Sequence, residues 1–188
     1  MIKIGIQGGK GSFSEIAAKN FIEKQKIVEY EIDYLISSEN VLHSIEHEKI
    51  NYGIFAIENV RGGIVLESIK AFAKYRCDII DMFQIFVSQN LLTLPNVQKH
   101  EITQIHSHVQ ALRQCREYLG DNFWGCQLIE ADDTAESARR LRDSQLPKTA
   151  AVIANKICAE IYGLHVLQEN IQDLKNNLTL FLAVKKLF

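Results

Sequence analysis

Short apolar segments alternate with segments of helical periodicity along this chain. Ile2 to Ile6 forms a compact apolar run that predicts a buried strand. Between Val28 and Ile36 every second residue is apolar, with Glu29, Glu31 and Asp33 in between, which indicates a strand with one exposed face. Segments with helical spacing follow most of the predicted strands. This β-α repeat predicts an α/β protein with largely parallel sheets and helices on their faces.

The pattern also predicts two lobes. The apolar run from Ile79 to Leu94 is too long for one average strand, so we expect the chain to leave the first lobe near Phe86 to Gln89. The last apolar run, Asn176 to Val184, is predicted to return as a buried strand of the first lobe. The predicted division is residues 1–86 plus 168–188 for lobe 1 and residues 87–167 for lobe 2.

Small polar residues follow four of the predicted strands, at points where helices begin. They are Ser12 and Ser14, Asn59, Ser107 to Gln110, and Asp133 with Thr134. Ligands of α/β sheets bind outside the carboxyl ends of strands, and a helix start carries partial positive charge. Several such starts would suit a small ligand with more than one carboxylate. Thr179, at the mouth of the last strand, fits an ordinary β-branched strand residue as well as a hydroxyl in a site.

Composition narrows the class of protein. The chain has 188 residues, of which 47% are hydrophobic and 23% charged, and its net charge is -2. These values are typical of a soluble globular protein. With no block of basic residues, nucleic acid is not an expected partner. With no long apolar stretch and no leader pattern, we expect no membrane association and a cytoplasmic location.

The sequence gives little support for a metal, a disulfide or a nucleotide. None of the four cysteines forms a CxxC pair, so reduced, buried thiols are expected. His43 and His47 are four residues apart, but Ser44 rather than a glutamate follows the first histidine, and Glu46 is not at the position that a zinc protease uses. The glycine-rich loop Gly8 to Gly11 lacks both the Walker A ending and the GxGxxG spacing, which makes it a weak nucleotide motif.

Six motifs, in order along nearly the whole chain, resemble the prephenate dehydratase family. Residues 8–18 are similar to its G-P-x-G-T-F-S-E-x-A-A, residues 57–65 to I-E-N-S-x-x-G-x-V, and residues 107–115 to S-H-P-Q-A-L-x-Q-C. Residues 133–138 are similar to S-T-A-x-A-A, and residues 150–164 to a later helix. The last match is to N-I-x-D…N-x-T-R-F, over residues 170–181.

The resemblance implies two α/β lobes with a cleft between them, like a type II periplasmic binding protein. It implies a lyase that converts prephenate to phenylpyruvate in phenylalanine biosynthesis, a part of the shikimate pathway, with no metal and no organic cofactor. Thr179 would be the catalytic hydroxyl that assists the departing ring hydroxyl. The substrate-binding residues would be Ser12, Phe13, Ser14, Asn59, Arg61, Ser107, His108, Gln110, Thr134 and Phe181. For His108, a role as a helix cap or packing residue is weighed equally with a role as acid or base.

The chain departs from the family pattern at several positions. Leu180 stands where the family has an arginine that helps hold a substrate carboxylate, and Val60 replaces a serine. Gly9 and Val109 replace prolines, and Asp133 replaces another serine. Losing the arginine removes a planar carboxylate donor. Arg61 would either take over that contact or face solvent.

These departures keep two alternatives open. One is a paralogue with a changed reaction on prephenate, such as a decarboxylase that does not aromatise its product. The other is a protein that binds small carboxylates without catalysis. The family commonly carries a C-terminal ACT domain that binds phenylalanine, and we expect none in this chain. The resemblance also implies a homodimer or a tetramer.

Overall fold

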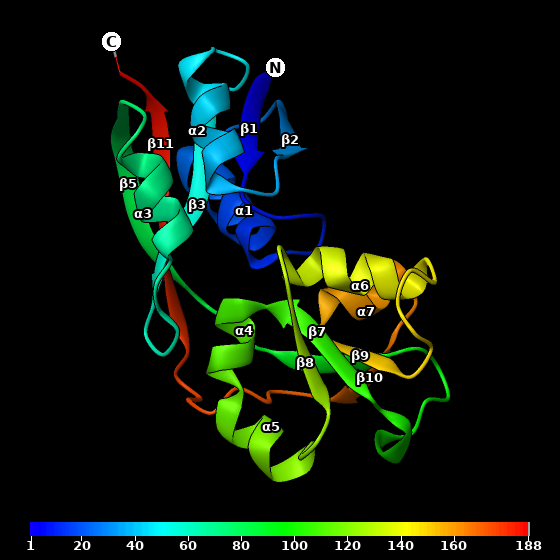
Figure 1. The fold of residues 1–188 in the computed structure, drawn as a ribbon. Coiled ribbons are helices and arrows are strands. Elements are labelled where there is room, and N and C mark those ends of the chain that lie inside the picture. Colours follow the sequence, from blue (N-terminus) through cyan, green and yellow to red (C-terminus); the bar gives the residue numbers. More distant parts are fainter. Residues whose placement is uncertain (188) are drawn as a thin grey trace. The chain divides into compact units, whose positions relative to one another are not determined.

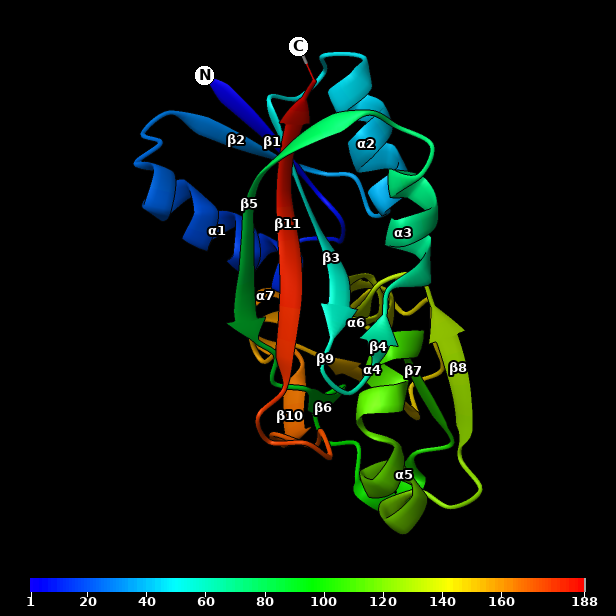
Figure 2. The ribbon, with the colours of Figure 1, turned by 90° about the vertical axis from the view of Figure 1, so that its left-hand side faces the viewer.

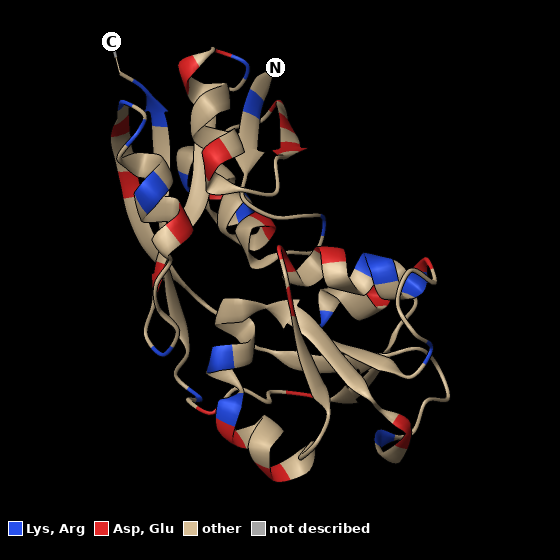
Figure 3. Ribbon diagram, viewed as in Figure 1, with Lys and Arg blue, Asp and Glu red and all other residues tan. Residues whose placement is uncertain are grey.

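The computed structural model describes residues 1–187 and divides them into two compact units (Figure 1). The first unit contains residues 1–9, 13–86 and 178 onward, and the second contains residues 10–12 and 87–177. Both units are α/β, which confirms the predicted class. Acidic and basic residues are interspersed along the ribbon of each unit (Figure 3).

The first unit is built on one mixed sheet in the order β2-β1-β3-β11-β5, with β4 paired to β3. Figure 2 shows β11 between β3 and β5, with α1 on one side of the sheet and α2 and α3 on the other. The strands are β1 (Ile2–Ile6), β2 (Tyr30–Tyr34), β3 (Tyr52–Asn59), β4 (Gly63–Ile64), β5 (Cys77–Phe86) and β11 (Leu178–Lys186). The helices are α1 (Phe13–Gln25), α2 (Ser38–Glu46) and α3 (Leu66–Phe72).

The core of the first unit forms where α2 and α3 cover β3 and β11. Val41, Leu42 and Ile45 of α2 pack on Phe55 of β3, together with Leu182 and Val184 of β11. Helix α2 begins after Ser37, whose side chain caps it by accepting a hydrogen bond from the Asn40 amide. The last strand therefore does return to the first unit, as the sequence predicted, and it becomes an interior strand there.

The second unit has a five-stranded sheet in the order β10-β6-β9-β7-β8. The strands are β6 (Asn90–Thr93), β7 (Gln104–His108), β8 (Gln127–Ala131), β9 (Ala150–Ala154) and β10 (His165–Gln168). The helices are the 3-10 turn η1 (Lys99–Glu101), α4 (Val109–Gln114), α5 (Arg116–Asn122), α6 (Thr134–Arg142) and α7 (Ile157–Tyr162). Gly163 is the C-cap of α7 and has the left-handed φ of 63° that favours glycine.

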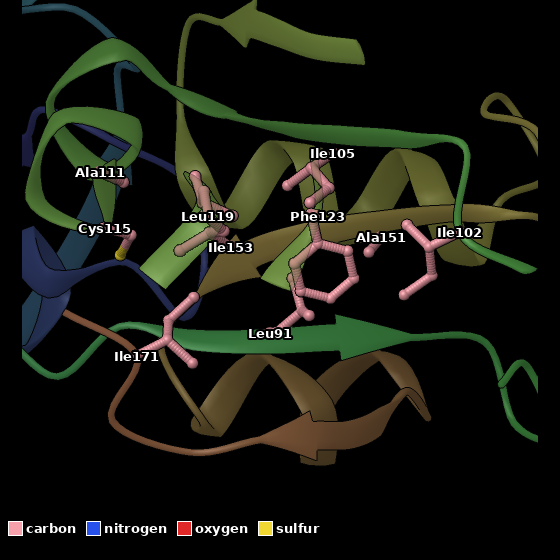
Figure 4. Close-up of a cluster of buried hydrophobic side chains, with 10 residues drawn as sticks. All are labelled: Leu91, Ile102, Ile105, Ala111, Cys115, Leu119, Phe123, Ala151, Ile153 and Ile171. Atoms are coloured by element: carbon pink, nitrogen blue, oxygen red, sulfur yellow. The ribbon is translucent and has the colours of Figure 1, made fainter. Parts of the chain in front are cut away.

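Two hydrophobic clusters cover the two faces of this sheet. In Figure 4, Ala111, Cys115, Leu119 and Phe123 of the α4 and α5 region gather with strand residues such as Ile105. The second cluster joins residues of α6 and α7 to the other face, among them Ala135, Ala138, Leu141 and Ala159. The second unit is therefore a helix-sheet-helix sandwich.

Three predictions about the fold need correction. The sheets are mixed rather than largely parallel, because β11 runs antiparallel to β3 and β5, and β6 runs antiparallel to β9 and β10. The single helix predicted after Ser107 is two helices, interrupted at Cys115. The stretch 168–177 belongs to the second unit, because its side chains hydrogen-bond there and Ile171 joins the core around Ile105.

Gly53 of β3 lies under α2 with no space for a side chain. A Cβ at this position would lie 2.6 Å from Cγ1 of Val41 and 3.1 Å from Cγ2 of Val184. We expect Gly53→Ala to destabilise the protein by about 1–3 kcal/mol through overpacking. Gly120, in the interior of α5, has no atom within 4 Å of the same position. Gly120→Ala is the matched control and should stabilise the protein by about 0.5–1 kcal/mol. Urea unfolding of both variants tests this, and equal stability would contradict it.

Candidate functional site

The side chains of Asn59 and Thr179 meet on adjacent strands of the first unit. Asn59 ends β3, Thr179 is the second residue of β11, and the antiparallel register places them directly opposite each other. Asn59 Nδ2 donates to Thr179 Oγ1 at 2.8 Å. A threonine hydroxyl that accepts this bond keeps its own proton for donation to another group. Both residues are buried, so the hydroxyl is held in a fixed position.

The remaining hydrogen bonds of Asn59 organise the loop after β3. Its Oδ1 accepts from the backbone N–H groups of Arg61 at 3.0 Å and of Gly62 at 2.7 Å. Its Nδ2 also donates to the carbonyl of Leu178 at 3.0 Å. One carboxamide thus fixes both the turn that carries Arg61 and the start of β11. Arg61 itself is exposed on this turn.

Leu180 lies on the sheet face opposite Thr179, because successive side chains of a strand alternate. Its cross-strand neighbours are Glu58 on β3 and Gln84 on β5. Phe181 returns to the face of Thr179 and is buried there, with its ring stacked on Phe83 at a centroid distance of 6.3 Å. Phe181 thus packs on the same face of the sheet as Thr179, and its contact with substrate stays a prediction from the resemblance.

The first turn of α1 provides Phe13 and Ser14 to the first unit. Ser14 is buried and Phe13 is partly buried. The preceding residues, Lys10 to Ser12, belong to the second unit. The sequence analysis grouped Ser12 with Ser14 after the first strand. The structure assigns Ser12 to the second unit and Ser14 to the first.

The loop segment Lys10 to Ser12 is anchored by α7. Tyr162 donates its hydroxyl to the Lys10 carbonyl at 2.8 Å, and the Cys158 thiol lies 3.4 Å from the Gly11 carbonyl. Burial raises the pKa of Tyr162 to about 12, so the hydroxyl stays a donor at neutral pH. Gly11 has a φ of +90°, and a Cβ there would meet Cys158 Sγ at 2.9 Å. Sequence reasoning does not find this anchor, because a tyrosine alone carries no signal for it.

Strand β7 ends with Ser107 and His108. Ser107 is fully buried and donates to the Ile153 carbonyl of β9 at 2.7 Å. His108 is the N-cap of α4, and its Nδ1 accepts from the Gln110 amide at 3.2 Å. A ring nitrogen that accepts this bond carries no proton, so the proton of the neutral ring lies on Nε2. The structure thus shows the capping role for His108 and leaves Nε2–H as a donor.

Thr134 begins α6 next to this point of the sheet, because β7 and β8 are parallel and His108 pairs with Ala131. Asp133 is the N-cap of α6 and accepts from the Glu136 amide at 2.8 Å. Aspartate caps helices as well as serine does. The replacement of the serine by Asp133 therefore preserves the local structure and leaves Thr134 buried in the first turn.

His106 and the cysteines do not form a reactive centre. Burial lowers the pKa of His106, and its Nε2 lies 3.1 Å from Gln104 Oε1. The four cysteines are free thiols in the described part of the chain, with Cys115 and Cys158 buried. Burial raises the pKa of Cys77 to about 11 and raises the pKa of Cys115 well above its usual range. The thiols of Cys77 and Cys115 are therefore protonated and unreactive at neutral pH.

Among residues 1–187, no three His, Cys, Asp or Glu side chains come together in a way that could hold a metal ion. Within the same range, no helix has the combination of length and apolar character that crossing a membrane requires.

Asn59 has a structural role that stability measurements can isolate. We expect Asn59→Ala to lower the free energy of unfolding by about 1–3 kcal/mol, because the buried amides of the loop lose their acceptor. Asn51 is an exposed asparagine of the same unit, and its Oδ1 accepts one bond, from the Lys3 amide. Asn51→Ala is the matched control and should cost about 1 kcal/mol or less. Chemical denaturation compares the two, and an equal loss would show that burial of Asn59 is unimportant.

Comparison with known proteins adds a family and a fold. A family model described as prephenate dehydratase matches residues 4–187. Prephenate dehydratase of Lactococcus lactis is 32% identical over 187 residues, which cover 98% of this chain and 64% of the relative. Arogenate dehydratase/prephenate dehydratase 1 of Arabidopsis thaliana is 34% identical over 185 residues, covering 98% of this chain and 45% of the relative. The chain thus spans between about half and two thirds of the length of these relatives.

Two solved structures show the fold. The structure of prephenate dehydratase from Arthrobacter aurescens in complex with L-Phe matches with a TM-score of 0.85 at 23% identity, covering 100% of this chain and 61% of that one. A periplasmic substrate-binding protein of an ABC transporter from Coxiella burnetii matches with a TM-score of 0.53 at 13% identity, covering 97% and 84%. The predicted likeness to periplasmic binding proteins is confirmed at the level of the fold.

Proposed function

Since the chain belongs to the prephenate dehydratase family, we propose that it catalyses the decarboxylative dehydration of prephenate to phenylpyruvate. The observation that carries the proposal is the bond from Asn59 Nδ2 to Thr179 Oγ1, which holds a buried hydroxyl with its proton available. The hydroxyl belongs to Thr179, the residue that the resemblance assigned to catalysis. The proposed place of the reaction is phenylalanine biosynthesis in the cytoplasm.

The reaction breaks two bonds and forms one aromatic ring. The C–C bond to the ring carboxylate breaks, and CO2 leaves while its bonding electron pair completes the aromatic ring. The C–O bond to the ring hydroxyl breaks at the other end of the ring, and that oxygen takes a proton and leaves as water. One proton is consumed overall. The enzyme must place a dianion, stabilise the departing oxygen and keep water away from the carboxylate.

Thr179 is proposed as the donor to the departing oxygen. Its Oγ1 accepts from Asn59, and this bond turns the O–H away from Asn59 and toward another acceptor. A hydrogen bond that strengthens as charge develops on the leaving oxygen lowers the barrier, whereas a bond of constant strength only aids binding. Asn59 would therefore act on the reaction by orienting Thr179.

The resemblance also assigns substrate binding to polar residues that belong to the second unit. They are Ser12, Thr134, Gln110 and His108, whose hydroxyl, amide and Nε2–H groups can each donate to a carboxylate. His108 and Ala131 pair in register, so the polar residues that follow β7 and β8 share one edge of the sheet. Ser107 is held to the Ile153 carbonyl and supports β7 at this edge. Assembly as a homodimer or tetramer stays a prediction from the resemblance.

We expect purified protein to form phenylpyruvate from prephenate, and Thr179→Ala to lower kcat by about 100-fold or more. Thr179→Ser keeps the hydroxyl and should keep most of the activity. Absorbance of phenylpyruvate in alkali measures the product, with arogenate tested in parallel because one relative is named for both substrates. Near-normal turnover by Thr179→Ala would remove Thr179 from the mechanism. Tight prephenate binding without product, measured by calorimetry, would favour the non-catalytic alternative.

Leu180 stands at the position of the family arginine, and its placement changes what that arginine is expected to do. A guanidinium at position 180 would emerge on the face opposite Thr179, across from Glu58. An arginine there would therefore pair with Glu58 rather than with a substrate carboxylate held beside Thr179. This reading accounts for how the family reaction tolerates leucine.

We expect Leu180→Arg to leave kcat and KM for prephenate within about threefold of the parent, since the arginine acts away from the substrate. It should raise the free energy of unfolding by at most about 1 kcal/mol, through a partly exposed ion pair with Glu58. The same substitution in a Glu58→Gln background should lose that gain, which the double-mutant cycle measures. A rise of more than about tenfold in kcat/KM would instead place the arginine on the substrate.

A further inference from the structure

Four buried carboxamides cluster at the two chain segments that connect the second unit to the first. One segment follows β5, and the other precedes β11. Gln89 and Asn177 lie on the two connecting segments, Gln114 ends α4, and Gln172 lies on the bend before β11. Each is less than 5% exposed. Buried amides cost free energy unless they are hydrogen-bonded, so their partners show what they hold in place.

One oxygen atom connects both segments. Gln114 Oε1 accepts from Gln89 Nε2 at 2.9 Å and from Asn177 Nδ2 at 2.8 Å. Gln89 follows β5 by three residues, and Asn177 immediately precedes β11. The backbone of α4 is tied to the same bend, because the Gln114 carbonyl accepts from the Asp173 amide at 2.8 Å. The end of α4 therefore fixes both chain segments at once.

Asn177 also continues the pairing of β5 with β11. The Val87 amide donates to the Asn177 carbonyl at 2.8 Å, and Asn177 Nδ2 donates to the Val87 carbonyl at 3.0 Å. The next pair along is Phe86 with Leu178, the last pair of the ladder. The backbone is thus held without interruption up to the residue before Thr179.

Leu178, which lies between Asn177 and Thr179, is also held by hydrogen bonds from the end of β3 and the loop after it. The Leu178 carbonyl accepts from the Val60 amide at 3.0 Å and from Asn59 Nδ2 at 3.0 Å. A shift of Asn177 would therefore move the Leu178 peptide and, with it, the distance between Asn59 Nδ2 and Thr179 Oγ1. An error of about 1 Å in the position of a reacting group costs about 100-fold in rate.

We propose that Gln114 and Asn177 are positioning residues that set the place of the Thr179 hydroxyl through the Leu178 peptide. The role in catalysis rests on the proposed function, whereas the anchoring itself does not. Helix α4 then has two tasks, because it begins at the cap formed by His108 and ends at Gln114. A purely structural amide cluster would affect stability alone, which separates the two interpretations.

The test compares Gln114→Met with Gln114→Glu. Methionine keeps the length of the side chain but accepts neither hydrogen bond, whereas a glutamate oxygen accepts both. We expect Gln114→Met to lower kcat for prephenate by about tenfold or more with KM within about threefold, the pattern of an interaction needed only in the transition state. Gln114→Glu should recover most of kcat. Should Gln114→Met fail to fold, Asn177→Asp removes the donor to Gln114 and is expected to show the same loss.

Asn90→Ala is the matched control. Asn90 is a buried amide of the same unit that donates to the carbonyls of Ser88 and Ala154 and accepts from the Asn170 amide, so it holds the start of the bend rather than its end at Asn177. It should lose stability and leave kcat within about threefold. Amide hydrogen exchange of residues 178–181, followed by NMR, gives a readout that needs no activity, and only Gln114→Met should accelerate it by about tenfold or more.

The outcomes separate the two proposals. A parent protein without dehydratase activity would refute the proposed function, while faster exchange in Gln114→Met alone would still support the anchoring. An active parent whose kcat is unchanged by Gln114→Met would overturn the positioning role. Equal losses of kcat in Gln114→Met and Asn90→Ala would overturn it too, because they would reflect general destabilisation.

Discussion

The carboxamide of Asn59 is the interaction on which the candidate site depends. It connects β3 with β11 through Thr179 and Leu178, and it holds the turn through the amides of Arg61 and Gly62. No hydrocarbon side chain can do this, because the position needs two donors and an oxygen that accepts twice. The burial of Asn59 follows from the same requirement, since a low local dielectric strengthens these bonds. The carboxamide of Asn59 therefore stabilises both the pairing of β3 with β11 and the position of Thr179.

Much of the fold could be predicted from local pattern. Strand and helix periodicities differ, so the β-α alternation could be predicted from segments such as Ile2 to Ile6 and Val28 to Ile36, which contain β1 and β2. Strand direction was not readable, because it depends on partners far away in the sequence. β11 is apolar in the way a parallel core strand is, yet it lies antiparallel between β3 and β5.

The sequence predicted those site residues whose type indicates their chemistry. It did not predict the residues whose role depends on a hydrogen bond to a distant group. Asn59 and Thr179 stood out at strand ends, and the structure brings them to 2.8 Å. The stretch 168–177 was assigned to lobe 1, but Gln172 and Asn177 are buried by hydrogen bonds within the second unit. Phe181 packs on Phe83, and its assignment to the site stays a prediction. Polarity in a sequence does not reveal which amides are paired.

The position of β11 has a consequence for how the two units fold. β3 and β5 share no direct pairing in the described residues, and β11, which joins them, follows the whole of the second unit along the chain. The sheet of the first unit therefore depends on pairing between residues far apart in sequence, whereas the second unit is nearly continuous. Contacts at long sequence separation form slowly, because the intervening chain has to close a loop first. The sheet of the first unit is therefore expected to be completed more slowly than that of the second.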